Sequence, residues 1–262
     1  GGGIPKVTAN KAIELSSGEF VLPFWRENAL LGKNKACKQM TGKTSAGVLV
    51  SQDRGATWKA YGELTTKGSW LIENAVVELP DKRLMMVFRT RVQTIHVTYS
   101  TDRGRSWSPS GPLAKLKNPN SKVDMIRLHP GGQLVLAYND HVAPNKDELL
   151  AASGCVKCRT NLKVAISHDD GSSWTNIALL EDELAPTLRI HYPTLQQVGC
   201  RVLVAYSQFH KVIEHSDPAF TRQGIKLARV DLNLGEPGLR IGVSDTAAGE
   251  GDMAAAGDRA WP

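Results

Sequence analysis

The sequence has few of the features that would assign it to a specialised class of protein. Of its 262 residues, four are cysteines, which is too few for a disulfide scaffold at this length, and 6% are aromatic. No apolar run approaches the roughly 18 residues that a membrane span needs. The chain begins Gly1-Gly2-Gly3, and no basic stretch followed by an apolar one is visible, so no targeting segment is identified and the compartment stays open.

Charge and cysteine spacing also point to no special partner. A formal net charge of +6 and a pI near 9.1 favour an anionic partner weakly, because the basic residues are spread along the chain. Nucleic-acid binding would need a dense basic run or interleaved aromatics, and the sequence has neither. Cys155 and Cys158 form a single CxxC, for which a loop disulfide or two free thiols is favoured over zinc. We therefore expect no metal, no cofactor and no nucleic-acid partner.

One motif, however, occurs three times. The pattern Ser-x-Asp-x-Gly-x-Ser/Thr-Trp occupies residues 51–58, 100–107 and 167–174, each time after an apolar run. Its Asp can accept hydrogen bonds from nearby backbone amides, and its Gly can take the positive φ that other residues avoid. Its Trp can pack beneath the turn and anchor the next strand. The motif predicts a repeated tight β-hairpin.

The segments around the motifs predict four antiparallel units in tandem, without helical periodicity between them. The expected strands are 12–15, 20–24, 45–50 and 59–64; then 75–79, 84–88, 94–99 and a weaker segment after 107; then 125–128, 133–138, 162–166 and 176–180; and finally 194–198, 201–206 and 225–230. The last unit ends without a motif or a fourth strand. We interpret residues 1–232 as an all-β domain, about four C-terminal blades of a six-bladed β-propeller. Residues 233–262, rich in Gly and Ala, are expected to be a disordered tail.

In a propeller the repeated motif lies at the outer rim, so its expected role is structural. Functional groups are expected where the inner strands start and the second strands end, because these positions meet around the axis on one face. The candidates at these positions and beside them are Arg26, Glu73, Arg89, Arg91, Asp140, His141, Arg159 and Tyr192. Together they predict a polar, cation-rich funnel.

The repeats resemble the Asp-boxes of the sialidase (neuraminidase) superfamily, and the likeness is strongest to BNR-repeat sialidase-like proteins. Residues 73–81 with 85–89 resemble the sialidase blade that begins with a Glu and ends in an Arg. Residues 159–162 are similar to the segment that carries another arginine, and residues 180–182 with 191–195 to the stretch that leads to the nucleophilic Tyr. The resemblance covers about residues 10–232.

This resemblance implies a retaining exo-glycosidase for terminal sialic or related acidic sugars, with a glycan as partner and no cofactor. Tyr192 would be the nucleophile and Glu73 its base, while Arg89 and Arg159 would grip the substrate carboxylate, with Arg91 as an alternative to Arg89. Guanidiniums suit this task because they bind a carboxylate bidentately. A neutral phenol suits an anomeric carbon that bears a carboxylate, since that negative charge would repel a carboxylate nucleophile.

One part of the sialidase pattern is missing. In sialidases the first clamp arginine and the general-acid Asp come from the first blade, and no segment of this chain matches that blade. Arg26 and Asp140 are possible substitutes, and His141 and His191 are either acid–base groups or hydrogen-bonded rim residues. Two alternatives therefore stay open: a glycosidase for a different sugar, and a catalytically inactive Asp-box propeller that binds glycans or proteins.

Overall fold

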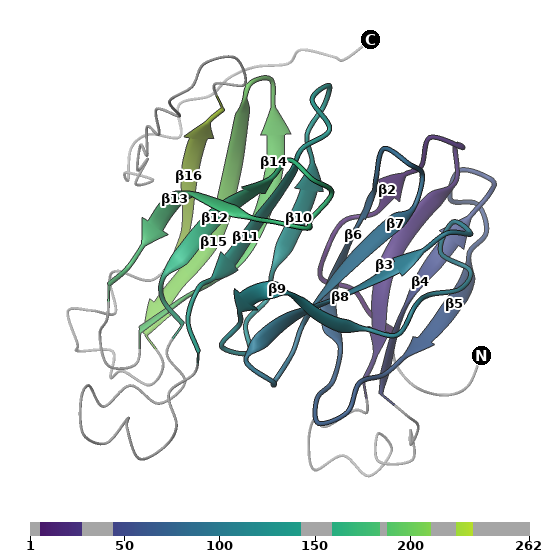
Figure 1. The fold of residues 1–262 in the computed structure, drawn as a ribbon, viewed down its shortest axis with the longest axis horizontal. Helices are drawn as coiled ribbons and strands as arrows, with labels where there is room; N and C mark the ends of the chain where they lie inside the picture. Colours follow the sequence, from purple (N-terminus) through teal and green to yellow (C-terminus); the bar gives the residue numbers. More distant parts are fainter. Residues whose placement is uncertain (1–5, 28–43, 143–158, 184–187, 211–223, 233–262) are drawn as a thin grey trace, which may run out of the picture.

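The computed structural model describes residues 6–27, 44–142, 159–183, 188–210 and 224–232, which form antiparallel β-sheets and the loops between their strands (Figure 1). Within these ranges, no helix is long and apolar enough to cross a membrane. The predicted tail at 233–262 lies outside the described residues, as do Cys155 and Cys158. Cys200 is an exposed free thiol.

The first sheet has a divided inner strand. Its strands are β1 (Lys6–Val7), β2 (Ile13–Glu14), β3 (Phe20–Arg26), β4 (Ser45–Ser51) and β5 (Lys59–Leu64). Both β1 and β2 pair with β3, β1 at Trp25 and Arg26 and β2 at Phe20 and Val21. The first strand expected from the sequence was 12–15, so the pairing of Lys6 and Val7 adds a strand ahead of it. The residues between β1 and β2 leave the sheet and run toward the inner strands of the other sheets.

The other three sheets follow in chain order. The second contains β6 (Ile72–Glu78), β7 (Leu84–Arg89), β8 (Thr94–Ser100) and β9 (Gly111–Lys117); the third β10 (Asp124–Arg127), β11 (Leu134–Asn139), β12 (Leu162–Ser167) and β13 (Thr175–Glu181); the fourth β14 (Leu188–Val198), β15 (Arg201–His210) and β16 (Gly224–Asp231). Contacts of β6 with β3 and β10, and of β10 with β14, place the sheets side by side (Figure 1). The predicted all-β propeller with four blades in this chain is confirmed.

The hydrophobic core lies between neighbouring blades rather than inside a single sheet. Three apolar clusters fill the spaces between the first and second, the second and third, and the third and fourth blades. Strand β7 is buried at every residue and β6 at all but its last, because each has a neighbouring blade on both faces. This double burial explains why residues 75–77 of β6 and 84–88 of β7 are continuous apolar runs instead of alternating ones.

Each repeated motif forms the predicted hairpin between the third and fourth strands of its blade. In the second copy, Asp102 accepts the backbone N–H of Ser106 at 2.8 Å and its hydroxyl at 2.5 Å. The Nε1–H of Trp107 donates to the carbonyl of Gly104 at 2.9 Å, and Gly104 has a φ of +86°. The copies at 51–58 and 167–174 repeat these bonds.

The second and third copies of the motif also fasten their blades to the preceding blade. In the second copy, Arg105 forms a 2.5 Å ion pair with Glu19 of the first blade. A Cβ at Gly104 would lie 3.1 Å from Val48 of the first blade, and one at Gly171 would lie 2.7 Å from Met85 of the second. The glycine therefore serves two needs, the left-handed turn and the close approach of two blades.

Candidate functional site

Glu73 and Tyr192 both lie at irregularities of inner strands. The pairing of β6 with β7 shifts between Ile72 and Ala75, and that of β14 with β15 shifts between His191 and Thr194. Glu73 has a φ of +50° and Tyr192 a φ of +57°, values that side-chain-bearing residues rarely adopt. A bulge of this kind re-aims a side chain that regular pleating would direct elsewhere.

The sequence predicted that both residues start their strands, and here the structure requires a correction. Glu73 is the second residue of β6, close to the prediction, but Tyr192 is the fifth residue of β14, well inside the strand. Residues 188–191 were not expected to pair, yet they extend the ladder with β15 beyond the bulge. The bulge, rather than the strand end, is what directs the Tyr192 side chain.

The bulges bring Tyr192, Glu73 and Arg89 into direct contact. The phenol of Tyr192 donates a 2.9 Å hydrogen bond to Oε1 of Glu73. Nη1 of Arg89 lies 2.9 Å from both carboxylate oxygens of Glu73 and 3.3 Å from the phenol oxygen. The side chains of Glu73 and Arg89 are 7% and 9% exposed, so this ion pair is largely removed from water.

Arg159 lies beside the Tyr192 ring. Its guanidinium carbon is 5.8 Å from the ring centroid, Nη2 donates to the carbonyl of Asn120 at 2.8 Å, and Nη1 contacts Nδ1 of His191. Asn120 also accepts a 2.8 Å bond from Nε of Arg89 through Oδ1. The structure thus brings together all four residues for which the sialidase resemblance implied roles.

The surroundings of the cluster are strongly cationic. Burial, together with the neighbouring Arg89, lowers the pKa of Arg159 to about 10. Burial and the three nearby guanidiniums of Arg159, Arg189 and Arg89 lower the pKa of His191 to about 3. His191 is therefore neutral at physiological pH, and because Arg159 can only donate, the His191 proton belongs on Nε2. Neutral His191 adds no positive charge, so the cationic character comes from the guanidiniums.

This arrangement can bind an anion beside a phenol. Tyr192 is 37% exposed, whereas Glu73 and Arg89 are buried. A ligand can therefore contact the Tyr192 side chain while the carboxylate that accepts the phenol proton is shielded. Glu73 is positioned as a base for Tyr192, since the pair is within hydrogen-bond distance without any rearrangement.

The other four predicted site residues are held elsewhere. Arg91 stacks on Trp70, with its guanidinium carbon 3.1 Å from the ring centroid, and Arg26 donates to the hydroxyl of Ser45 and the carbonyl of Gly62. None of these bonds connects Arg91 or Arg26 to the Tyr192 cluster. Arg89, rather than Arg91, is the arginine that contacts Glu73.

Asp140 and His141 lie at the end of the second strand of the third blade. Asp140 forms a 2.8 Å ion pair with Lys163. Nδ1–H of His141 donates to the carbonyl of Val142, and Nε2 accepts from the backbone N–H of Thr160 at 3.3 Å. Burial lowers the pKa of His141, which keeps the imidazole neutral. His141 therefore supports the strand that follows Arg159 instead of contacting Tyr192.

Sequence reasoning missed three residues that surround the cluster. Asn120 bonds both arginines, and Asn10 donates through Nδ2 to the carbonyls of Glu73, at 3.0 Å, and Asn74, at 3.1 Å. Lys122 donates to the carbonyl of Pro193, next to Tyr192, at 2.5 Å. In the sequence, Asn10 and Lys122 are polar residues close to the starts of inner strands, and the turn-forming pair Asn118-Pro119 is the one signal that could point to Asn120.

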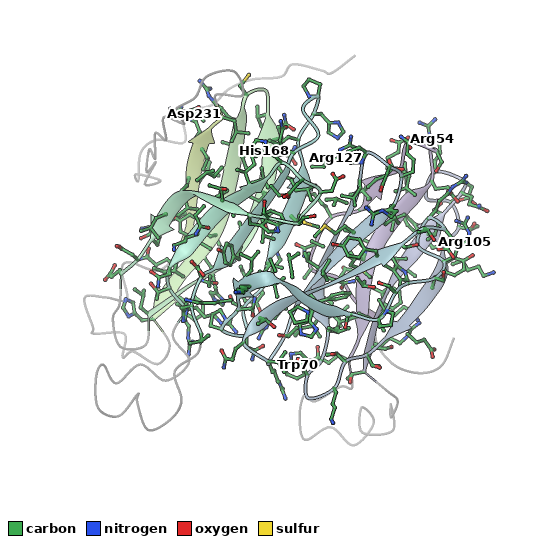
Figure 2. The ribbon with its side chains drawn as sticks, viewed as in Figure 1. Arg54, Trp70, Arg105, Arg127, His168 and Asp231 are labelled. Carbon is green, nitrogen blue, oxygen red and sulfur yellow. The ribbon has the colours of Figure 1, made fainter. Side chains whose placement is uncertain are left out.

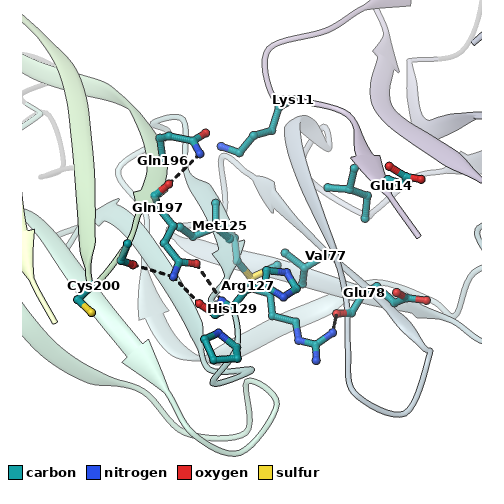
Figure 3. Close-up of a pocket in the computed structure, with 14 residues that line it drawn as sticks. Lys11, Glu14, Val77, Glu78, Met125, Arg127, His129, Gln196, Gln197 and Cys200 are labelled. Carbon is teal, nitrogen blue, oxygen red and sulfur yellow. Dashed lines mark hydrogen bonds between the residues drawn. The ribbon is translucent and has the colours of Figure 1, made fainter. Parts of the chain in front are cut away.

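A pocket of about 660 Å³ lies at the ends of the inner strands that are opposite to the Tyr192 cluster (Figure 3). Val77 and Glu78 of β6 line it, together with Arg127 and Gln197. Glu78 is five residues beyond Glu73, or roughly 16 Å along an extended strand. Trp70, just before β6, and Arg127, at the end of β10, are likewise at opposite ends of the molecule (Figure 2). The pocket is therefore separate from the Tyr192 cluster.

Metal ligation finds no support in the part of the chain that the structure describes. No group of three or more His, Cys, Asp or Glu side chains there is placed to hold a metal ion.

The fold and the cluster together define an Asp-box propeller with a polar, arginine-rich site on its inner strands. The family model for the BNR repeat-like domain matches residues 3–204, and the chain belongs to this family. Comparison with curated proteins gave no match. The family relationship agrees with the Asp-box resemblance found in the sequence.

Solved structures with the same fold include sialidases. The NanB sialidase of Streptococcus pneumoniae is 17% identical with a TM-score of 0.54, covering 76% of this chain and 27% of its own. The Trypanosoma rangeli sialidase is 14% identical with a TM-score of 0.54, covering 80% and 29%. A Dyadobacter fermentans protein of unknown function is 19% identical with a TM-score of 0.59, covering 87% and 54%. The chain thus spans between about a quarter and about half of the length of these proteins, and it shares the sialidase propeller fold.

Proposed function

We propose that this chain carries the nucleophilic half of a sialidase-like site, which hydrolyses terminal sialic or related acidic sugars with retention. The observation that carries the proposal is the contact of Tyr192, Glu73 and Arg89. In this mechanism the Tyr192 oxygen attacks the anomeric carbon while Glu73 takes the phenol proton. The glycosidic C–O bond breaks at the same time, and the aglycone oxygen leaves with the bonding electrons and takes a proton from water. Water later cleaves the resulting glycosyl–tyrosine bond and restores the phenol.

Arg89 and Arg159 bind the substrate carboxylate in this proposal. Arg89 is fixed by Glu73 and Asn120, and Arg159 by Asn120 and His191, so both guanidiniums are oriented before the substrate arrives. The cationic surroundings favour an anionic sugar over a neutral one. The proposal assigns roles to a nucleophile, its base and two arginines. It assigns no residue as a third arginine for the carboxylate or as a proton donor for the leaving oxygen.

The test is release of the fluorophore from a fluorogenic α-sialoside by the full chain and by Tyr192→Phe. Wild type should turn over, and Tyr192→Phe should lose activity by at least about 100-fold, because phenylalanine cannot form the covalent intermediate. The matched control is Tyr206→Phe, which removes a buried phenol that bonds Glu181 in the outer part of the blade. A Tyr192→Phe enzyme as active as wild type would refute the assignment.

A binding protein without turnover is the second candidate, and one feature favours it. Arg26 and Asp140, the substitutes considered for the first-blade arginine and acid, bond Ser45 and Lys163 in the described part of the chain and do not contact Tyr192 there. In that case wild type would bind a sialoside without cleaving it. A glycosidase for another sugar would instead cleave a non-sialic member of a glycoside panel.

A further inference from the structure

The residues between β9 and β10 form a rigid turn at the edge of the candidate site. Nδ2 of Asn118 donates to the carbonyl of Ser121 at 2.8 Å, and the backbone N–H of Ser121 donates back to Oδ1 of Asn118 at 2.9 Å. The backbone N–H of Asn118 also donates to the carbonyl of Gln93. Asn118 and Ser121 are buried, and Asn120 has a φ of +59°. Residues 118–122 are therefore held by their own side chains in one conformation.

The turn uses two different groups of Asn120 to hold two arginines. The side-chain oxygen accepts Nε–H of Arg89, and the backbone carbonyl accepts Nη2–H of Arg159. Arg89 comes from the second blade and Arg159 from the third. One residue thus fixes the spacing and orientation of two guanidiniums that different blades supply.

The same turn also supports the bulge that carries Tyr192. Lys122 is 2% exposed, and its ammonium donates to the carbonyl of Pro193, the residue after Tyr192. Leu195, two residues further, is held by Asp124, whose Oδ2 accepts its backbone N–H at 2.7 Å. Burial lowers the pKa of Lys122, and the carboxylates of Asp124 and Glu73 act against this shift. The bond to Pro193 therefore comes from a buried group that is held between the two strained inner strands. Tyr192 is the strained residue directly before that carbonyl.

We propose that residues 118–122 are a positioning loop for the site, in which Asn120 sets the geometry of anion recognition and Lys122 sets the position of the nucleophile. Neither residue is assigned contact with the reacting atoms. The kinetic and binding parts of this inference rest on the proposed function, whereas the spectroscopic part does not. The inference predicts different defects for the two residues, which a general structural role would not produce.

Asn120→Gly tests the recognition arm. Glycine accepts the positive φ and keeps the backbone carbonyl for Arg159, so only the Oδ1 acceptor for Arg89 is lost. We expect wild type to bind N-acetylneuraminic acid more tightly than its methyl ester, and the variant to lose about tenfold of affinity for the acid while its affinity for the ester is unchanged. Lys82→Gly, at another left-handed position in an exposed turn, is the matched control and should change neither affinity.

Lys122→Met tests the nucleophile arm. Methionine keeps the apolar stem and removes the donor to Pro193, so the Tyr192 bulge loses its support. We expect kcat on a fluorogenic sialoside to fall by about 10- to 100-fold with KM nearly constant, because a displaced nucleophile affects reaction more than binding. Lys115→Met, on the exposed face of β9, is the matched control and should retain the kinetic constants of wild type.

A readout without ligand separates this inference from the proposed function. In ¹⁵N NMR of the free protein, the Nε–H of Arg89 should be protected from exchange, and Asn120→Gly should raise its exchange rate at least about tenfold. If wild type cleaves no sialoside but this protection is present and lost in Asn120→Gly, the proposed function fails and the loop's role stands. The positioning loop is refuted if, in both variants, kcat falls and KM rises in proportion to a fall in Tm. It is also refuted if neither variant changes exchange, binding or turnover.

Discussion

The buried ion pair of Glu73 and Arg89 allows a quantitative prediction for one perturbation, Glu73→Gln. The amide has the shape of the carboxylate but no charge, so Arg89 is left without its counter-ion in a place where its side chain is 9% exposed. Tyr192 also loses the carboxylate oxygen that accepts its phenol proton. The variant should therefore be impaired in both stability and activity.

The size of the stability loss follows from the geometry of the pair. Two unit charges about 4 Å apart attract by about 4 kcal/mol at the effective dielectric of about 20 that suits such sites. Breaking a buried pair from one side typically costs about 3–5 kcal/mol. Because Asn120 still bonds Arg89, we expect the lower end, a loss of about 3 kcal/mol in the free energy of unfolding. That loss corresponds to a fall in Tm of about 6–12 °C.

The assay is urea unfolding followed by circular dichroism, with Asp81→Asn as the matched control. Asp81 pairs with Arg83 at 2.6 Å, but both side chains are at least 40% exposed, so this control should lose less than about 1 kcal/mol. In a double-mutant cycle with Arg89→Met, the pair should show a coupling of about 2–3 kcal/mol. Activity of Glu73→Gln should fall by about 10²- to 10⁴-fold, as expected for a lost general base. Equal free energies of unfolding for Glu73→Gln and Asp81→Asn would refute this account of the site. So would a coupling between Glu73 and Arg89 below about 0.5 kcal/mol.

Three further predictions concern the blades and the pH dependence of stability. In urea unfolding, Gly171→Ala should lower the free energy of unfolding by about 2 kcal/mol more than Gly18→Ala. Both glycines have nearly the same φ, but only at Gly171 would a Cβ lie 2.7 Å from Met85. Equal losses would contradict the packing role of Gly171. Burial raises the pKa of Glu19, but hydrogen bonds, led by the one from Arg105, outweigh burial and lower this pKa to about 2. Above pH 4.5, wild type should therefore be about 2 kcal/mol more stable to unfolding than Glu19→Gln. This difference should disappear as the pH falls toward 2. Burial lowers the pKa of His191 to about 3, so below pH 6.5 the unfolded chain gains a proton that the folded chain does not. Between pH 6 and 4, the free energy of unfolding of wild type should therefore fall by up to about 1.4 kcal/mol per pH unit relative to that of His191→Gln. A parallel pH dependence of the two free energies would show that His191 is not buried as a neutral group.

The strands and blades could be predicted from the sequence because the repeated motif fixed their phase. Residues 100–107 locate the end of β8 and the approach to β9, and the apolar runs ahead of them then count back to β6 and β7. The same counting placed Glu73 and Arg89 on adjacent strands of one blade, where residue pairing brings Ile72 opposite Arg89. Local turn chemistry and strand periodicity are enough for this level of structure.

The residues that orient the site could not be predicted in the same way. Asn120 and Lys122 act through a backbone carbonyl and across blades, 39 and 71 residues away in the chain, so no local pattern marks them. The left-handed conformations of Glu73 and Tyr192 are also invisible, because neither residue type favours a positive φ. Arg91 and Arg89 are equivalent in sequence terms, since residues two apart in a strand share a face. β7 ends at Arg89, and the turn that follows it places Arg91 on Trp70 while Arg89 contacts Glu73.

The two strained residues explain how the propeller separates stability from chemistry. A regular inner strand would keep Glu73 and Tyr192 in the ladders, where strand alternation would direct their side chains away from each other's positions in the site. The bulges lift both residues out of their ladders at a cost of order 1–3 kcal/mol each, which persists only where the surroundings hold the backbone in place. Asn10 bonds the carbonyl of Glu73 and Lys122 bonds the carbonyl that follows Tyr192, so each strained residue has one polar side chain from another segment beside it. The Asp-box hairpins at the rim stabilise the blades. This stability offsets the locally unfavourable backbone of the inner strands at the site.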